Sequence, residues 1–559
     1  DDDTTNTLHS SGTGFRFEIS GSETGRFDSA GLDVTGAVTA TSTINGVGIL
    51  ADTTNFVDSI LISQDAGTGT LSSASHNTGL GDSVFNALTS GINNTGIGSN
   101  SLLSNTTGNE NTSVGSNALD ANTTGSQNTA LGKSALSANT TASFNTAIGR
   151  QALLVNTTGA SNVAVGMNTL MANTTADNNT AVGKSALTAN TTGTANVATG
   201  FNSLASNTTG DFNVAIGYNA LDANTTADNN VAVGTSALGA NTTGADNIAI
   251  GKNTMVLNTT GANNVAIGTQ ALDANTTANN NNAFGYQALS SNTTGSANNA
   301  FGFQALVANT TANHNSGFGS SALGANTTGA NNTGLGSNAL LLNTTGSNNV
   351  AVGYAALDAN TTADDNVAVG VLSLSANTTG ASNTAIGKSA LLANTTASAN
   401  TAVGYQSFAA LTTGTRNTGL GYHSGLNATS NDNVVVGYAA AEALTSGSSN
   451  IIIGSKSGQN LTEGNNNVVM GVEALDADTL GDRNVAIGNQ ALSAQNFTSS
   501  TDVYNVAIGH QALTSSTTGN KSVAVGGLAL QSNTTGSSNV AIGYQTLDAN
   551  TTASYNTAI

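Results

Sequence analysis

One repeat unit of this chain reads Asn213-Val214-Ala215-Ile216-Gly217-Tyr218-Asn219-Ala220-Leu221-Asp222-Ala223-Asn224-Thr225-Thr226-Ala227-Asp228-Asn229. The next copy begins at Asn230, and this period of seventeen runs without interruption from Asn77 to Asn417. Four copies follow from Asn433 after a step of 16, and four from Asn505 after a step of 21, which makes 29 copies. A short fixed period indicates a solenoid, because one copy cannot bury its apolar face alone and stacked neighbours form one core.

We number the places in each copy from position 1, the starting Asn, to position 17. Position 5 is Gly in all 28 copies that are long enough to show it, which predicts a positive φ or a close backbone approach. Position 3 is nearly always Ala, Gly or Ser between larger apolar or β-branched residues, so we expect a strand with one tightly packed face. The Asn at position 1 predicts either a turn corner or an amide ladder along the stack.

A second apolar rank lies at position 9, which is Leu in 22 of 28 copies. The sequence Asn-Thr-Thr follows at positions 12 to 14 and is intact in 20 copies, with Gly or Ala at position 15. We predict two short strands per repeat, the Val-Ala-Ile run and the Ala-Leu region, joined by two turns. The fold class is therefore all-β, a parallel β-solenoid or β-roll with one coil for each seventeen-residue repeat.

Stacked coils place identical positions in ladders about 4.8 Å apart, so 29 coils predict a rod on the order of 140 Å long. We expect Phe284, Phe301 and Phe318, taken as an inner apolar position, to stack on one another, and likewise Tyr405, Tyr422 and Tyr438 after the Gly. Asp recurs at position 10 but never in successive copies. This spacing favours the ladder arrangement, because like charges one strand apart destabilise a sheet.

Residues 1–76 lie outside the repeat and alternate apolar and polar residues, so we expect a β-rich N-terminal cap region before the solenoid of residues 77–559. The irregular steps at 417–433 and 484–505 predict a one-residue deletion and a four-residue loop near Phe497 that leave the core intact. The block between them is aliphatic at position 3, with Val435, Ile452 and Val469, so its packing must differ. Ile559 falls inside a repeat, and we expect the solenoid to continue beyond it.

Composition narrows the function classes. Charged residues make up 8% of the chain, and Pro, Cys and Trp are absent, which is unlike an ordinary enzyme. Without Cys there is neither a disulfide framework nor a thiolate metal site. The net charge of −20 disfavours nucleic acid and anionic membranes as partners, and no apolar run reaches membrane-spanning length.

Candidate chemistry is sparse. The five histidines fall at unrelated places without ligand spacing, so we predict no metal site: His9, His76, His314, His423 and His510. Four lysines directly after the position-5 Gly indicate a solvated edge: Lys133, Lys184, Lys252 and Lys388. The scattered Asp residues offer no convergent carboxylate pair for a depolymerase. We therefore predict no catalytic residues, no cofactor and no enzymatic activity.

Asn-Thr-Thr is also an N-glycosylation sequon, with one acceptor per coil. A sugar on every coil would crowd at one strand spacing, so turn chemistry is the simpler interpretation. The regular threonines also resemble those of ice-binding solenoids. Here they are adjacent in a turn and would point to opposite faces if extended, which disfavours that function.

The unit Asn-Thr-Ala-Ile-Gly-x-x-Ala-Leu-x-x-Asn-Thr-Thr-Gly resembles the repeat shafts of tail-fibre-like and adhesin-like proteins of phages and bacteria. Its Val-Ala-Ile-Gly core is similar to the head repeats of trimeric autotransporter adhesins, although their period is shorter. The segment from Gly31 to Gly46 resembles the stretch that precedes such repeats in fibre proteins. The resemblance implies a left-handed parallel β-roll, an extracellular location and a trimer.

Two functions remain open. The first is a structural and adhesive extracellular fibre shaft that holds a binding tip away from its base. The second is a filament or binding surface for ice or glycans along the ladder faces. We expect self-association as a homotrimer, because such short coils enclose a thin core and the small residue at position 3 suggests close approach of another backbone. A receptor or glycan would be bound through other parts of the assembly.

Overall fold

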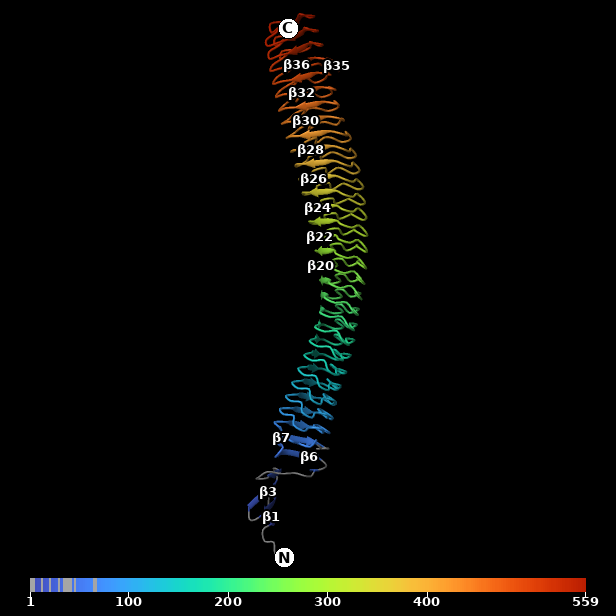
Figure 1. The fold of residues 1–559 in the computed structure, drawn as a ribbon, viewed down its shortest axis with the longest axis vertical. Coiled ribbons are helices and arrows are strands. Elements are labelled where there is room, and N and C mark those ends of the chain that lie inside the picture. The colour runs from blue at the N-terminus through green and yellow to red at the C-terminus, as the bar shows by residue number, and fades with distance from the viewer. Residues whose placement is uncertain are drawn as a thin grey trace. The chain divides into compact units, whose positions relative to one another are not determined.

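The computed structural model describes residues 6–11, 14–19, 22–28, 31–33, 43–44, 47–63 and 68–559, with side chains for 54–63 and 68–559. Two compact units divide the chain, residues 1–213 (unit 1) and residues 214–559 (unit 2). All regular elements in the described residues are β-strands (Figure 1). The parallel β-solenoid of about 29 coils, one for each seventeen-residue repeat, is confirmed.

Unit 1 begins with antiparallel strands. Two antiparallel sets, β1 to β4 and β5 to β7, precede the coils. Their bounds are β1 (Asn6–Ser11), β2 (Gly14–Ile19), β3 (Ser22–Asp28), β4 (Gly31–Asp33), β5 (Thr43–Ile44), β6 (Val47–Thr53) and β7 (Phe56–Ser63). Strand β7 also pairs in parallel with β8 and β9, so the first coil lies against it. Part of the fibre-like segment from Gly31 to Gly46 lies outside the described residues.

The remaining strands of unit 1 belong to the coils. They are β8 (Ala74–Ser75), β9 (Thr78–Leu80), β10 (Thr95–Ile97), β11 (Thr112–Val114), β12 (Thr129–Leu131), β13 (Thr146–Ile148), β14 (Val163–Val165), β15 (Thr180–Val182) and β16 (Val197–Thr199). From β9 to β16 each strand pairs in parallel with the next.

Unit 2 continues the same pattern, and in Figure 1 its labelled strands from β20 to β36 follow one another in coil order. Its strands are β17 (Val214–Ile216), β18 (Val231–Val233), β19 (Ile248–Ile250), β20 (Val265–Ile267), β21 (Asn282–Phe284), β22 (Asn299–Phe301), β23 (Ser316–Phe318), β24 (Thr333–Leu335), β25 (Val350–Val352), β26 (Val367–Val369), β27 (Thr384–Ile386), β28 (Thr401–Val403), β29 (Thr418–Leu420), β30 (Val434–Val436), β31 (Ile451–Ile453), β32 (Val468–Met470), β33 (Gly481–Asp482), β34 (Val485–Ile487), β35 (Thr501–Asp502), β36 (Val506–Ile508), β37 (Val523–Val525), β38 (Val540–Ile542) and β39 (Thr557–Ala558).

Each regular coil contains one strand, at positions 2 to 4, so the expected second strand in the Ala-Leu region is wrong. Leu221 at position 9 has φ 52°, and position 7 before it is also left-handed, as at Asn219 with φ 50°. A left-handed residue interrupts an extended run, so this side of the coil forms turns. The turns still bond from coil to coil, since the Leu221 amide donates to the Ala237 carbonyl at 2.9 Å.

The core of each coil is formed by positions 1, 3, 8, 9, 12 and 15. Ala215 at position 3 is fully buried inside its own coil. A Cβ at Gly317, also position 3, would lie 3.2 Å from the Ala322 carbonyl oxygen and 3.4 Å from Cγ of Leu306. The small residue therefore makes room for the chain's own Leu rank, and the expectation that it faces another backbone is wrong.

Positions 2 and 4 point outward. Phe284, Phe301 and Phe318 do stack, with ring centroids 4.5 Å and 4.8 Å apart, which confirms the ladder. Their placement on the inner face is wrong, because Phe318 is 37% exposed. The alternation of small and large residues along the strand holds, but the small residue is the one that faces the core.

Two asparagine ladders run through the core of unit 1. The position-1 amide ladder has the main-chain nitrogen of Asn179 donating to Oδ1 of Asn162 at 3.0 Å. In the position-12 ladder, Nδ2 of Asn190 donates to Oδ1 of Asn173 at 3.0 Å. Both ladders converge on the position-15 carbonyl, since Gly193 O accepts Nδ2 of Asn179 and of Asn190 at 2.9 Å each. These bonds explain how fully buried amides are accommodated.

The irregular steps leave the strand register intact, as expected. Strand β30 pairs with β29 across the deletion, and β36 pairs with β34 across the insertion. The inserted loop folds back over the coil, where Phe497 is 8% exposed and β33 pairs with β35.

The aliphatic block has altered packing, also as expected, but within its own core. Its three large position-3 residues are all fully buried: Val435, Ile452 and Val469. Position 9 lacks Leu in the same region, at Gly425, Ala441 and Gly458. The large residues therefore fill space within the chain's own core that Leu occupies elsewhere.

Candidate functional site

The titratable residues that the sequence singled out are dispersed. His314 and His510 are exposed in separate coils, and His76 lies 3.4 Å from Asp58. The side chain of His9 lies outside the described residues. Among residues described with side chains, no three His, Cys, Asp or Glu could hold a metal ion together. The same residues include no helix suited to crossing a bilayer.

The position-10 aspartates of unit 2 lie in coils that are not adjacent to one another, and Asp476 shares its coil with Glu473. Burial raises the pKa of Asp222, Asp273, Asp358 and Asp476, while backbone hydrogen bonds partly oppose this. Oδ1 of Asp273 and of Asp358 has no hydrogen-bond partner. The structure does not bring two of these carboxylates into successive coils, so they do not form the acid and base pair of a glycosidase.

The acceptor asparagines of the Asn-Thr-Thr sequons are buried. Every Asn of an intact Asn-Thr-Thr from Asn105 to Asn533 is fully buried. In Asn190 both Nδ2 hydrogens are used, one on Asn173 and one on Gly193. A sugar attached at Nδ2 would replace these bonds and has no space in the core. The structure therefore favours the turn interpretation of this motif.

The first Thr of the motif is structural and the second is exposed. Oγ1 of Thr191, at position 13, donates to the carbonyl of Thr208 in the next coil at 3.0 Å. Position 14 is an exposed Thr in every coil from Thr107 to Thr413. Each unit thus presents one regular rank of threonine methyl and hydroxyl groups to solvent.

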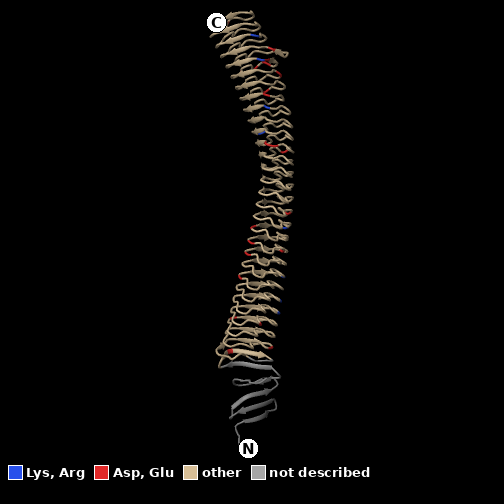
Figure 2. Ribbon diagram, turned by 45° about the vertical axis from the view of Figure 1, so that its right-hand side comes forward, with Lys and Arg blue, Asp and Glu red and all other residues tan. Residues whose placement is uncertain are grey.

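A more distinctive surface lies at position 6, directly after the invariant Gly, and we call it the position-6 edge. It carries seven of the nine tyrosines and five of the 11 basic residues of the chain, against one acidic residue, Asp82. Most of the described ribbon carries neither basic nor acidic residues (Figure 2), so the concentration of basic residues at position 6 is selective. Sequence reasoning noted single lysines and one tyrosine run here but missed the shared edge. Counting residue types by position would have found it.

In unit 1 the edge is basic. Lys133 and Arg150 occupy it in successive coils, and both are exposed. Together with Ser134 and Gln151 they line a cavity of about 120 Å³. Farther along the edge, Nζ of Lys184 lies 5.5 Å from the ring centre of Phe201, within range of a cation–π contact.

In unit 2 the edge is aromatic. Tyr405, Tyr422 and Tyr438 stack with centroids 5.3 Å apart, as expected, and Tyr286 stacks on Phe303 at 5.6 Å. These rings cover one another's faces and present mainly their edges and hydroxyl groups.

His423 lies beside this tyrosine column, with its ring 3.9 Å from that of Tyr422. Its Nδ1 lies 3.1 Å from Oε1 of Glu442, and its Nε2 lies 2.9 Å from Oε1 of Gln406. Glu442 also accepts Nε2 of Gln459 at 2.9 Å. The imidazole and carboxylate are therefore engaged within the fold, and this cluster is best explained as packing of the irregular coils.

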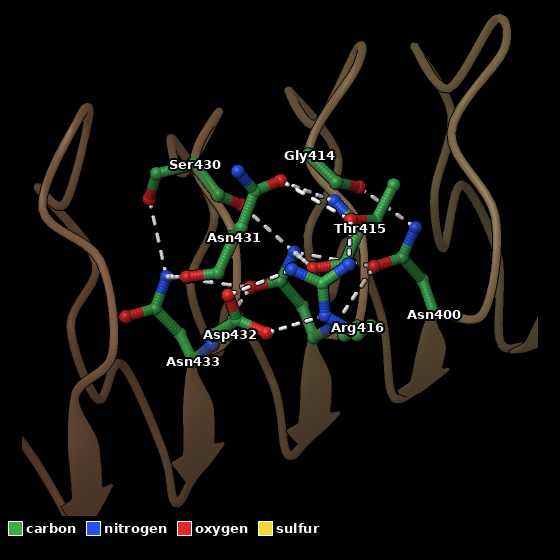
Figure 3. Close-up of polar contacts among 9 residues, drawn as sticks. Asn400, Gly414, Thr415, Arg416, Ser430, Asn431, Asp432 and Asn433 are labelled. Atoms are coloured by element: carbon green, nitrogen blue, oxygen red, sulfur yellow. Dashed lines mark hydrogen bonds and ion pairs between the residues drawn. The ribbon is translucent and has the colours of Figure 1, made fainter.

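At the deletion, Arg416 forms a two-pronged ion pair with Asp432, with Nε to Oδ1 at 2.6 Å and Nη2 to Oδ2 at 2.9 Å (Figure 3). The Arg416 guanidinium lowers the pKa of Asp432. Both side chains are exposed, and such pairs contribute little stability. The position-1 ladder continues across the deletion, since the main-chain N–H of Asn433 donates to Oδ1 of Asn417 at 3.0 Å.

Comparison with protein-family models, with curated proteins and with solved structures gives no match for this chain.

Proposed function

We propose that the chain is the shaft of an extracellular fibre, a tail fibre or a surface appendage, that holds a binding tip away from its base. The observation that carries this proposal is the coil-to-coil bonding within each unit. Within a unit, each coil bonds its neighbours through backbone groups, and the asparagine ladders join most coils as well. The register survives a deletion and an insertion in unit 2. Repetition of this kind adds length without new side-chain chemistry, which suits a spacer.

The proposed assembly is a homotrimer formed through the outward strand face, positions 2 and 4. Position 4 is Val, Ile, Leu, Phe or Met in every copy except Thr199, and neither position carries a charge in any copy. Ile216 and Ile250 at position 4 are 41% and 37% exposed. Exposed apolar patches larger than a few hundred Å² are rare on monomers and mark association surfaces. In a trimer of parallel chains, identical residues of the three chains would lie together around the axis, as cyclic symmetry requires.

Native mass spectrometry of the full chain tests the assembly. We expect a mass of three times 54.8 kDa for the wild type. The double change Ile216→Lys and Ile250→Lys should give monomers, because it buries charge in the interface. The matched control, Thr226→Lys and Thr260→Lys, adds the same charges to the exposed position 14 of the same coils and should remain trimeric. A monomeric wild type would contradict the trimer, and globular particles in electron microscopy would contradict the shaft.

The second candidate is a binding surface along the ladders, and the regular threonine rank at position 14 favours it. A row of exposed methyl and hydroxyl groups about 4.8 Å apart is a repeating template for ordered water. An ice recrystallisation assay tests it. Inhibition that is lost when Thr226, Thr243 and Thr260 are changed to Lys would support ice binding, and no inhibition by the wild type would exclude it.

A further inference from the structure

Lys133 and Arg150 place two positive charges in successive coils of unit 1. The main-chain N–H of Gln151 donates to the main-chain carbonyl of Lys133 at 3.0 Å, so the two coils are in direct contact at this edge. Lys133 and Arg150 lie in the turn after the strand, and like charges one coil apart repel each other. An anion bound between them would offset this repulsion. No ion pair to either residue is found among the described side chains. The fold itself therefore does not explain the pairing.

The cavity between these side chains is lined by hydrogen-bond donors. Ser134 and Gln151 complete its lining, and no hydrogen bond to either side chain is found in the described part of the chain. Elsewhere position-7 glutamines bond each other, as where Nε2 of Gln304 donates to Oε1 of Gln287 at 2.9 Å. The hydroxyl of Ser134 and the side-chain amide of Gln151 are thus available to a ligand, and no carboxylate lines the cavity.

We propose that this cavity binds the anionic group of an acidic polysaccharide, a sulfate ester or a carboxylate. The planar guanidinium of Arg150 matches two oxygens of such a group, and the ammonium of Lys133 neutralises it. Ser134 and Gln151 donate to the remaining oxygens. A polymer is favoured over a single anion because the same edge carries Lys184 two coils beyond Arg150, about 10 Å away.

The net charge of −20 opposes a polyanion at long range. At physiological salt the Debye length is about 8 Å, so distant carboxylates are largely screened while contacts in the cavity are not. The local pair therefore decides binding. This inference deepens the adhesive part of the proposed function and rests on it for the source of the glycan. Binding of the anion does not require a trimer or a long fibre.

Calorimetric titration of the full chain at physiological salt tests the site. The probes are dextran sulfate oligosaccharides, polygalacturonate oligosaccharides and neutral dextran. We expect one or both acidic probes to bind and neutral dextran not to bind, and the stronger acidic probe identifies the anion as sulfate or carboxylate. The variant Lys133→Gln with Arg150→Gln should weaken binding at least tenfold.

The matched control is Lys252→Gln with Lys388→Gln, which removes two positive charges from isolated places in unit 2. It should change the affinity less than twofold. Equal losses in both variants would show dependence on net charge alone and overturn the site, as would unchanged binding after Lys133→Gln with Arg150→Gln. Absence of binding by both acidic probes would also overturn it. Native mass tests the trimer and electron microscopy tests the shaft, so failure of either can be told apart from failure of the anion site.

Discussion

The side chain of Ile452 fills the space in front of Gly458, because a Cβ at Gly458 would lie 3.4 Å from Cδ1 of Ile452. Positions 3 and 9 of this coil therefore face each other across the core. In regular coils position 3 also meets the position-9 residue of the preceding coil, as a Cβ at Gly317 would lie 3.4 Å from Cγ of Leu306. A regular coil combines a small and a large residue there, as with Ala215 and Leu221, and this coil combines them in the reverse order. The filled volume is kept while the two residue types exchange places.

This exchange predicts strong coupling between the two sites. Ile452→Ala should cost about 2–5 kcal/mol through the cavity it leaves. Gly458→Leu should cost about 1–3 kcal/mol by overpacking the core. It adds no backbone strain, because leucines at position 9 of other coils adopt the same φ. The double variant restores the regular residue types within this coil and should lose less free energy of unfolding than the two single changes added together. Hydrogen exchange of peptides covering residues 445–475 measures this, and additive losses would contradict the pairing.

Leu221→Asp should open unit 2 locally, because it places an unpaired carboxylate in a fully buried site. The expected cost is several kcal/mol, on the order of 4. Thr226→Ala is the matched control in the same coil, since Thr226 is exposed. Limited proteolysis should cleave the first variant near residue 221 and leave the second as resistant as the wild type. Equal resistance would show that the inside and outside positions are misassigned.

Asp478 predicts a pH dependence of the stability of unit 2. It replaces an Asn at position 12, is fully buried, and accepts Nε2 of Gln495 at 2.7 Å. Burial raises its pKa above the usual value, against hydrogen bonds from Gln495, Phe497 and Gly481. A raised pKa in the fold means that protonation stabilises the fold. This contribution is complete below the unfolded pKa of about 3.9 and is lost as the pH rises through the raised value.

Asp478→Asn should remove this dependence, because an amide at position 12 does not titrate. The stability of the variant relative to the wild type should therefore increase between pH 4 and pH 8. Urea unfolding at several pH values provides the measurement. A difference that stays constant with pH would mean that Asp478 titrates alike in the folded and unfolded chain.

The buried position-12 asparagines predict no N-linked sugar on the Asn-Thr-Thr motifs. When the chain is secreted from cells that attach such sugars, peptides of the folded product that contain Asn190 and its counterparts should be unmodified. The reason is that Nδ2 of these residues is committed to the ladder. Sequons with an exposed Asn, such as Asn427-Ala428-Thr429, are the internal control. Peptide mass mapping before and after treatment with an N-glycosidase provides the measurement. A soluble, folded product with a sugar on most coils would contradict the position-12 ladder.

Much of the solenoid was predictable from the period, since identical positions must stack when the spacing never changes. Stacking of Tyr405 on Tyr422 and the intact register across both irregular steps follow from that premise alone. The amide ladder at position 1 was one of two alternatives for the same Asn. The candidate edge at position 6 was missed because its members are several residue types, which become one surface only when the coils are stacked.

The sequence by itself determined the all-β solenoid, the length of its coil and the inward Leu rank, because a fixed period of apolar residues has one way to form a continuous core. Only the tertiary structure decided which side of the strand faces that core and how many strands a coil contains. Both depend on backbone dihedral angles. Leu221 at φ 52° and a leucine in a strand have the same signature in a sequence, although one turns the chain and the other extends it.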